Sequence, residues 1–196
     1  MKSTLFASFV ASAAAFAPSS NSKSSSALAA TMDKYPGSIN FAAKEFKFDP
    51  LGLSETYAPL MPFFREAELK HCRTAMLAVT GWIVADLGVR LPGEQFSVAN
   101  VPSSHDAHDL LLRGPMVFLL MAVGLFDLTA TGPGVSASMK GEREPGDFGW
   151  TQFAPKDKAA YDKKVNSELL NGRLAMFALG GIATQSELTG HGFPYI

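Results

Sequence analysis

The sequence predicts an all-α membrane protein with three transmembrane helices, the first and third of which form a crossed, pseudo-two-fold pair. Three apolar stretches, at residues 65–89, 107–129 and 165–188, are candidates for these helices. The first and third stretches are copies of each other at an offset of one hundred residues. Only 18% of residues are charged and 47% are hydrophobic, a composition that suits helices packed closely in an apolar surrounding.

Residues 1–31 precede the first acidic residue, Asp33, and are predicted to be a bipartite plastid targeting presequence. In residues 1–15, Lys2 is followed by an apolar run and small alanines, which is typical of a signal peptide. Residues 16–31 are serine-rich and acid-free, which is typical of a transit peptide. The Ala-Phe-Ala-Pro sequence around Phe16 resembles the junction of such presequences. Residues 32–196 are then expected to form one domain.

The repeat preserves charged residues inside apolar helices. Its identical pairs are Glu68/Glu168, Leu69/Leu169, Arg73/Arg173, Ala75/Ala175, Met76/Met176, Ala78/Ala178 and Gly81/Gly181. A glutamate and an arginine five positions apart lie about 140° apart around one helix, so each needs a partner elsewhere. We therefore expect Glu68 to meet Arg173 and Glu168 to meet Arg73 across the crossing, with the small repeated residues allowing close approach. Unpaired charges would cost roughly 3 kcal/mol each at a bilayer centre.

The distribution of basic residues predicts how the chain is oriented across the membrane. The segment between the second and third stretches is rich in them, and so is the segment before the first: Lys34, Lys44, Lys47, Arg65, Lys140, Arg143, Lys156, Lys158, Lys163 and Lys164. The first loop has only Arg90, and none follows Arg173. By the positive-inside bias, the N-terminus is predicted to face the stroma and the C-terminus the lumen.

The repeat also supplies ligands for a hard cation such as chlorophyll magnesium. Glu68 and His71 are three positions apart on one helix face, and Glu168 and Asn171 repeat this spacing. Carboxylate oxygen, amide oxygen and imidazole nitrogen all bind such cations. Each glutamate has two oxygens, so one is expected to accept from the crossing arginine while the other faces the metal.

The two repeat segments, 68–76 and 168–176, resemble the chlorophyll-binding helix motifs of the light-harvesting chlorophyll a/b-binding superfamily. Within it, the leader favours the fucoxanthin chlorophyll a/c-binding proteins, the diatom-type antenna. Residues 48–52 and 143–149 resemble loops that lie beside carotenoids in that family. The resemblance implies axial chlorophyll ligands at Glu68, His71, Glu168, Asn171 and Gln185, with Arg73 and Arg173 as interhelix partners that support the pigment sites.

Three further positions are tentative chlorophyll ligands: His108, Asp127 and His191. Asp127 stands where relatives have a longer Glu or Gln, which puts that ligand in doubt. His105 and His108 have a metal-like spacing, but this spacing is more often part of a polar helix entry. The only metal expected is chlorophyll magnesium. Cys72, the single cysteine, is expected to be a buried apolar filler.

The resemblance implies a light-harvesting antenna in a plastid thylakoid membrane. Its cofactors would be chlorophyll a, chlorophyll c and fucoxanthin, with diadinoxanthin as a further candidate. Its partners would be thylakoid lipids, other antenna subunits and a photosystem core. No enzyme is expected, because no catalytic constellation stands out, and the net charge of -1 gives no drive toward nucleic acid.

Two alternatives remain open. One is a photoprotective, energy-dissipating family member that senses lumen acidity through Asp86, Glu94, Asp106 or Glu187. The other belongs to a different class: a pigment-free membrane transporter or assembly factor that uses the intramembrane ion pairs.

Overall fold

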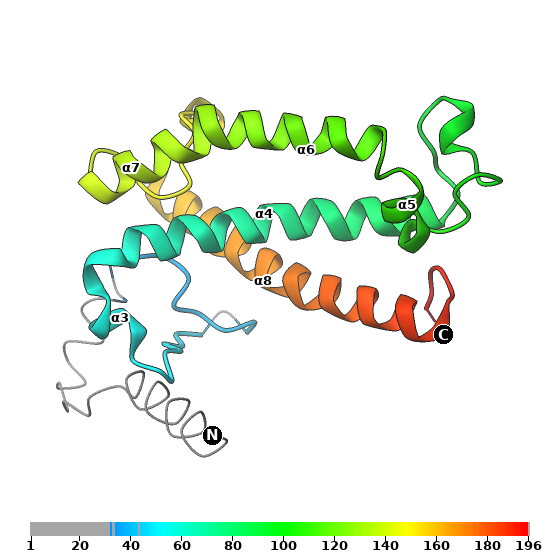
Figure 1. The fold of residues 1–196 in the computed structure, drawn as a ribbon. Helices are drawn as coiled ribbons and strands as arrows, with labels where there is room; N and C mark the ends of the chain where they lie inside the picture. The colour runs from blue at the N-terminus through cyan, green and yellow to red at the C-terminus, as the bar shows by residue number, and fades with distance from the viewer. Residues whose placement is uncertain (1–31, 33, 43, 196) are drawn as a thin grey trace, which may run out of the picture.

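The computed structural model describes residues 32, 34–42 and 44–195. The predicted presequence, residues 1–31, lies outside the described residues. Three long helical rods dominate the fold (Figure 1): α4 (Met61–Asp86), α8 (Lys158–Thr189), and a middle rod made of α6 (Pro115–Phe126), the π-helical turn η3 (Asp127–Thr131) and α7 (Gly132–Lys140). The described residues contain no β-strand, only an isolated bridge between Ile39 and Glu45. The all-α class predicted from the sequence is confirmed.

The remaining elements are short and lie in the connections between the rods. They are α3 (Leu53–Thr56), η1 (Ala58–Leu60), η2 (Glu94–Phe96), α5 (Ser104–Leu110) and η4 (Thr151–Phe153). Among the described residues, the span Pro115–Lys140 alone is long and apolar enough to count as a membrane-crossing helix by composition. Helices α4 and α8 fall short of that criterion because they carry charged residues along their length.

The middle rod differs from its predicted range of 107–129. The chain breaks at Gly114 and Pro115, and α5 forms a separate short helix before that break. Pro115 occupies the first helical position, where a missing N–H costs nothing. The rod then continues past residue 129 as far as Lys140 and ends at Gly141, which has a positive φ of 76°.

The middle rod passes through Pro133 without ending, because the π-helical turn precedes that proline. A proline inside an α-helix removes one hydrogen bond and its ring clashes with the carbonyl four residues earlier. The wider turn at Asp127–Thr131 shifts the hydrogen-bond register just before the Gly132-Pro133-Gly134 sequence. The chain therefore stays helical beyond residue 129, as far as Lys140.

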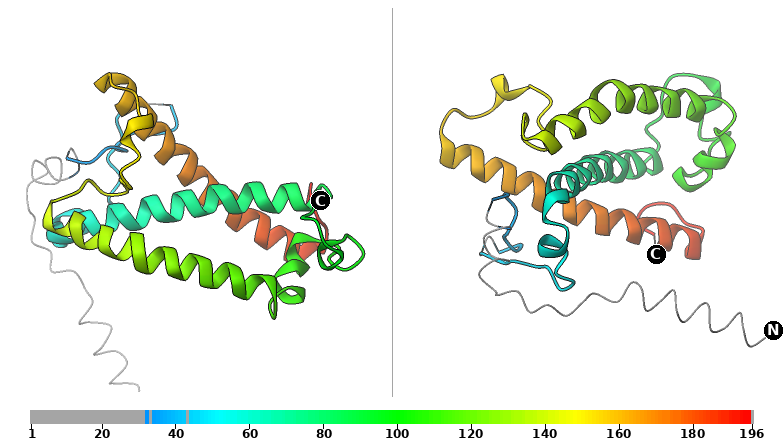
Figure 2. Two further views of the ribbon diagram at one scale, coloured as in Figure 1. Left: turned by 90° about the horizontal axis from the view of Figure 1, so that it is seen from above. Right: turned by 60° about the vertical axis from the view of Figure 1, so that its left-hand side comes forward.

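Helices α4 and α8 cross each other, and this contact forms most of the buried core (Figures 1 and 2). Leu69, Cys72 and Ala75 are buried on α4, and their repeat equivalents Leu169, Gly172 and Ala175 are buried on α8. The closest approach lies at Cys72 and Gly172, where a Cβ on the glycine would stand 2.3 Å from the Cys72 Cβ.

Gly81 and Gly181 do not contribute to the crossing, contrary to expectation. A Cβ at either position would meet nothing within 4 Å. The two helices diverge after the crossing, as both views in Figure 2 show. Both glycines are exposed, whereas Ile182 beside Gly181 is buried. Cys72 takes the buried filler role expected from the sequence.

Asp86 ties together the end of α4, the start of α5 and the C-terminal tail. Its Oδ1 accepts from the Ser104 N–H at 2.8 Å, and its Oδ2 accepts from the Phe193 N–H at 3.3 Å and the Tyr195 hydroxyl at 3.0 Å. Burial and the hydrogen bond to Asp86 raise the pKa of Tyr195 to about 12. The Asp86 carboxylate therefore holds α5 and the C-terminal tail at the C-terminal end of α4.

Substituting Gly172 with Ala is expected to force α4 and α8 apart at their closest contact. The clash would involve the Cys72 backbone as well as its side chain, so rotamer changes alone cannot relieve it. We expect a loss of about 1 to 3 kcal/mol in the free energy of unfolding, the usual range for overpacking. Chemical denaturation of the purified protein, followed by helical circular dichroism, measures this loss. Gly181→Ala is the matched control, and equal losses in the two variants would contradict the assigned crossing point.

Candidate functional site

Two reciprocal ion pairs join the crossed helices. The Arg73 Nε donates to Glu168 Oε1 at 2.6 Å, and the Arg173 Nε donates to Glu68 Oε1 at 2.8 Å. This is the pairing expected from the sequence repeat. The four side chains are about one-third exposed or less in the isolated chain, so neither pair is fully immersed in water.

Each arginine also holds a loop from the opposite half of the chain. The Arg73 Nη1 donates to the Gly146 carbonyl at 2.8 Å, and the Arg173 Nη1 donates to the Gly37 carbonyl at 2.7 Å. Both glycines follow a proline and have a positive φ. A Cβ on Gly146 would stand 2.5 Å from a Leu69 methyl group, and one on Gly37 would stand 2.7 Å from a Leu169 methyl group. The pseudo-two-fold relation therefore includes the loops before α8 and α4.

The N–H groups of the same glycines are also held by repeat-equivalent side chains. The Gly37 N–H donates to Asn166 Oδ1 at 2.9 Å, and the Gly146 N–H donates to Glu66 Oε2 at 2.6 Å. Glu66 is 3% exposed and also accepts from Arg143 at 2.8 Å. Sequence reasoning missed Glu66, Asn166 and the two loop glycines. The available signal was the recurrence of Pro-Gly before each helix of the repeat.

His71 and Asn171 are anchored in the same way on their two helices. The His71 Nδ1 lies 2.7 Å from the Ala67 carbonyl, and the Asn171 Nδ2 donates to the Ser167 carbonyl at 2.9 Å. A carbonyl accepts only, so the histidine Nδ1 carries its proton and Nε2 keeps a lone pair. Asn171 keeps its Oδ1 as an acceptor. Both side chains are exposed, so each helix presents one fixed acceptor outward.

The two glutamates are less alike than the repeat predicts. Within the described residues, Oε2 of Glu168 has no hydrogen-bond partner, so it is available to a ligand. Oε2 of Glu68 instead accepts from the Arg65 Nη1 at 2.5 Å. The residue equivalent to Arg65 in the second copy is Val165, which cannot donate.

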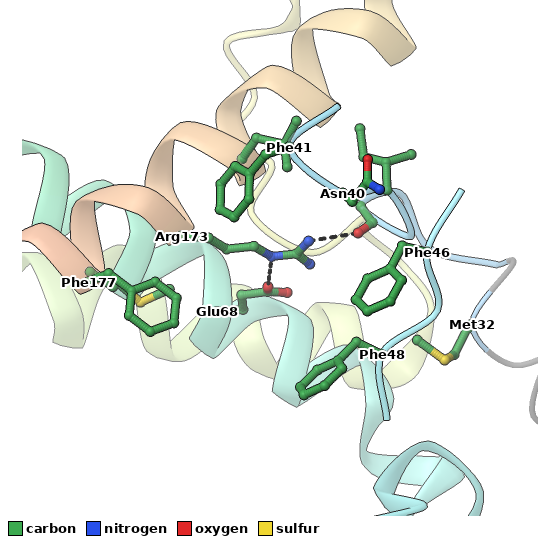
Figure 3. A pocket seen from close by; sticks show the side chains of 12 residues that line it. Met32, Asn40, Phe41, Phe46, Phe48, Glu68, Arg173 and Phe177 are labelled. Carbon is green, nitrogen blue, oxygen red and sulfur yellow. Dashed lines mark hydrogen bonds and ion pairs between the residues drawn. The ribbon is translucent and has the colours of Figure 1, made fainter. Parts of the chain in front are cut away.

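Beside the Glu68–Arg173 pair lies an apolar groove of about 630 Å³ (Figure 3). The loop before α4 contributes three phenylalanine rings to it, and each ring is at least half exposed. Figure 3 shows this loop opposite α8, with the Arg173 guanidinium between the loop and Glu68. Side chains of low polarity dominate the lining: Met32, Ile39, Phe41, Phe46, Phe48, Leu170, Met176 and Phe177, with Gly37, Asn40, Glu68 and Arg173. The groove suits an elongated or flat apolar ligand.

The other predicted ligands lie apart from the crossing. Gln185 is exposed on α8, about one turn before the helix ends at Thr189. His108 is exposed on α5 and contacts Asp109 at 3.0 Å. His191 is exposed in the tail after α8. In the part of the chain that the structure describes, no three His, Cys, Asp or Glu side chains gather as a metal cluster.

Asp127 forms a third link between helices. Its Oδ2 accepts from Lys70 of α4 at 2.6 Å, and its Oδ1 accepts from the Thr131 hydroxyl at 3.0 Å. Both oxygens of this tentative ligand are therefore engaged. Lys70 has no counterpart in the repeat, where Leu170 stands, and no sequence pattern pairs it with the middle rod.

A polar cluster links α5 to the end of α8. His105 Nε2 contacts Glu187 Oε2, and His105 Nδ1 lies 3.5 Å from Asp106. The hydrogen bonds to Glu187 and Asp106 raise the pKa of His105 above its usual 6.5. The carboxylates of Asp86, Asp106 and Glu187, scattered in the sequence, thus all lie around α5.

The chain is similar to proteins of a known family. A family model described as chlorophyll A-B binding protein matches residues 35–187. Fucoxanthin-chlorophyll a-c binding proteins F and D of Phaeodactylum tricornutum are 32% and 33% identical to the chain, with 96% of each chain covered. The fucoxanthin-chlorophyll a-c binding protein of Trieres chinensis is 31% identical over 97% of this chain and 96% of its own length. These relatives carry the designation chloroplastic.

Removing the two crossing arginines is expected to have unequal effects. Arg73→Leu leaves Glu168 with no cationic partner, whereas Arg173→Leu leaves Glu68 still paired with Arg65. We expect Arg73→Leu to lower the free energy of unfolding by about 3 kcal/mol, the cost of one unpaired charge inside a membrane, and Arg173→Leu to lower it by less. Paired denaturation curves of the reconstituted variants measure both losses. Equal losses would show that Arg65 does not compensate.

The contact between α5 and α8 is expected to weaken as the pH rises. Because the pKa of His105 is raised in the folded protein, protonated His105 stabilises this contact fully below its ordinary pKa of 6.5 and loses that effect as the pH rises through the raised pKa. Amide hydrogen exchange in α5, corrected for intrinsic rates, should be slower at about pH 6 than at about pH 8. His105→Gln should abolish the difference, whereas His108→Gln should leave it. The same corrected rates at both pH values would contradict the assignment.

Proposed function

The chain belongs to the chlorophyll A-B binding protein family, and from this membership we propose that it is a light-harvesting antenna subunit that binds chlorophyll a, chlorophyll c and fucoxanthin. It would pass excitation energy to a photosystem. The observation that carries the proposal is the duplicated set of outward-facing acceptors at the helix crossing: His71 and Asn171, each anchored to the carbonyl four residues earlier.

The donor atoms fit chlorophyll magnesium. The Nε2 of a neutral imidazole, an amide oxygen and a carboxylate oxygen each give one axial bond to a hard or intermediate cation. His71 and Asn171 keep such an atom free, and Glu168 keeps Oε2 free while Arg73 neutralises its charge. The hydrogen bonds behind these ligands fix their orientation, as partners of metal ligands generally do.

These residues support a function that involves no bond chemistry. The pigments supply the absorption when bound, and the chain's part is to hold them at fixed separations and to keep water away. The crossed helices and the two Pro-Gly loops form a rigid frame for the ligands. The aromatic groove beside Glu68 offers apolar surface of the kind a carotenoid or a chlorophyll ring covers.

We further propose that α4, the middle rod and α8 all cross a thylakoid membrane. With 26 or more residues each, they are about 39 Å or longer at 1.5 Å per residue, which exceeds the ~30 Å hydrocarbon core. By composition alone, α4 and α8 do not count as membrane-crossing helices. The two ion pairs at their crossing neutralise four of their charged side chains, which lowers the cost of placing them in a membrane. The basic loops support a stromal N-terminus and a lumenal C-terminus.

Other expectations stay proposals at this level. Residues 1–31 would be the plastid targeting presequence and residues 32–196 the antenna domain. Gln185, His108 and His191 are proposed as further ligands. Asp127 is the weakest candidate because both its oxygens are engaged. Thylakoid lipids, other antenna subunits and a photosystem core are the proposed partners.

His71→Leu and Asn171→Leu are each expected to remove one chlorophyll per polypeptide while the helix crossing stays intact. Reconstitution with chlorophyll a, chlorophyll c and fucoxanthin, followed by pigment quantification and fluorescence-excitation spectra, tests this. The wild-type spectrum should show chlorophyll a emission excited through chlorophyll c and the carotenoid. Thr80→Val, which removes an exposed helical hydroxyl bonded only to its own helix, is the control. A folded but colourless wild-type protein would favour a transporter or assembly factor.

A further inference from the structure

We propose that Arg65 makes the two repeat-related glutamate sites chemically unequal. The chlorophyll held through Glu68 is then bound more weakly than the chlorophyll held through Glu168, and it absorbs at a different energy. This inference rests on the proposed function, because it takes both glutamates as ligands.

The hydrogen bonds of the two glutamates differ at the second carboxylate oxygen. The crossing contacts are nearly equal, at 2.6 Å for Glu168 and 2.8 Å for Glu68. Arg65 then adds a second guanidinium to Glu68 at 2.5 Å, three positions earlier on the same helix. Val165 occupies the corresponding position before Glu168 and is partly buried.

Arg65 is held in this place by its surroundings. Its side chain is 11% exposed, and its guanidinium carbon lies 5.9 Å from the centre of the Tyr35 ring, which is itself buried. A Cβ on Gly37 would stand 3.3 Å from its Nη1, so the loop closes over it. The Arg65 Nε is buried without a hydrogen-bond partner. The second guanidinium is therefore a fixed part of the Glu68 site.

The two sites consequently carry different charge. Arg73 and Glu168 sum to zero, whereas Arg65, Arg173 and Glu68 leave one net positive charge. A carboxylate that accepts from two guanidiniums donates less electron density to a metal, and one of its oxygens must be shared. In a surrounding of low dielectric, the net charge also acts strongly on the electronic levels of a nearby ring.

Exchanging the two residues between the copies tests the inference. Arg65→Val gives the first copy the residue of the second, and Val165→Arg does the reverse with the same three-residue spacing. Each is made in wild-type, Glu68→Leu and Glu168→Leu backgrounds, which lack one ligand each, so that difference spectra and chlorophyll retained on serial dilution are assigned to one site. Arg65→Val should tighten the Glu68-dependent chlorophyll by about tenfold, and Val165→Arg should loosen the Glu168-dependent one by about as much, the low end for partners of metal ligands. Each exchange should also shift that chlorophyll's band.

Lys70→Leu is the matched control, because it removes a cation from the same helix that contacts Asp127 and not Glu68. If Arg65→Val fails to assemble because it loses its contact with Tyr35, Val165→Arg decides the question alone. Unchanged retention and unchanged bands in the exchanged variants would overturn the inference while leaving the antenna function intact. If Glu68→Leu and Glu168→Leu remove no chlorophyll, the ligand assignment fails and this inference fails with it.

Discussion

The whole arrangement depends on the two arginine–glutamate pairs across the α4–α8 crossing. Without them, Arg73, Arg173 and Glu168 would have no partner of opposite charge at the crossing. With them, each guanidinium has donors left over, and these hold the glycine carbonyls of two loops. One interaction thus neutralises charge, fixes the helix crossing and positions the segments that precede both helices. The candidate ligands His71 and Asn171 lie within one turn of these pairs.

The two copies of the repeat differ at two positions where α4 has a basic residue and α8 has an apolar one. Arg65 and Lys70 stand where the second copy has Val165 and Leu170. Arg65 adds to the Glu68 pair, whereas Lys70 connects α4 to Asp127 of the middle rod. The middle rod packs beside α4, as Figure 1 shows, whereas among the described helices α8 contacts α4 and the short helix α5. The residues that the two copies share therefore form the helix crossing. Of the two that differ, Lys70 attaches the middle rod to α4, and Arg65 changes the Glu68 site.

The sequence predicted the helical class, the crossed pair and the partner of each arginine, because an offset of one hundred residues preserves residue types whose charges need compensation. It failed for the limits of the middle rod, because a proline usually ends a helix and a π-helical turn is not visible in an apolar pattern. It also missed Glu66, because a buried carboxylate that binds a loop N–H and Arg143 has no periodic signature. Contacts between Lys70 and Asp127 depend on how the middle rod packs, and single-helix patterns do not contain that information.

The loop contacts have a consequence for the order in which the chain can assemble. Gly37, near the start of the described chain, is held by Arg173 of the last long helix, and Gly146 is held by Arg73 of the first. During synthesis from the N-terminus, the Gly146 loop can meet Arg73 and Glu66 of α4 as soon as it emerges, whereas the Gly37 loop has to wait for α8. A nascent chain that carries only its first two long helices lacks Glu168, the partner of Arg73, whereas Glu68 already has Arg65. The loop that is synthesised first is therefore the last of the two to be held in place.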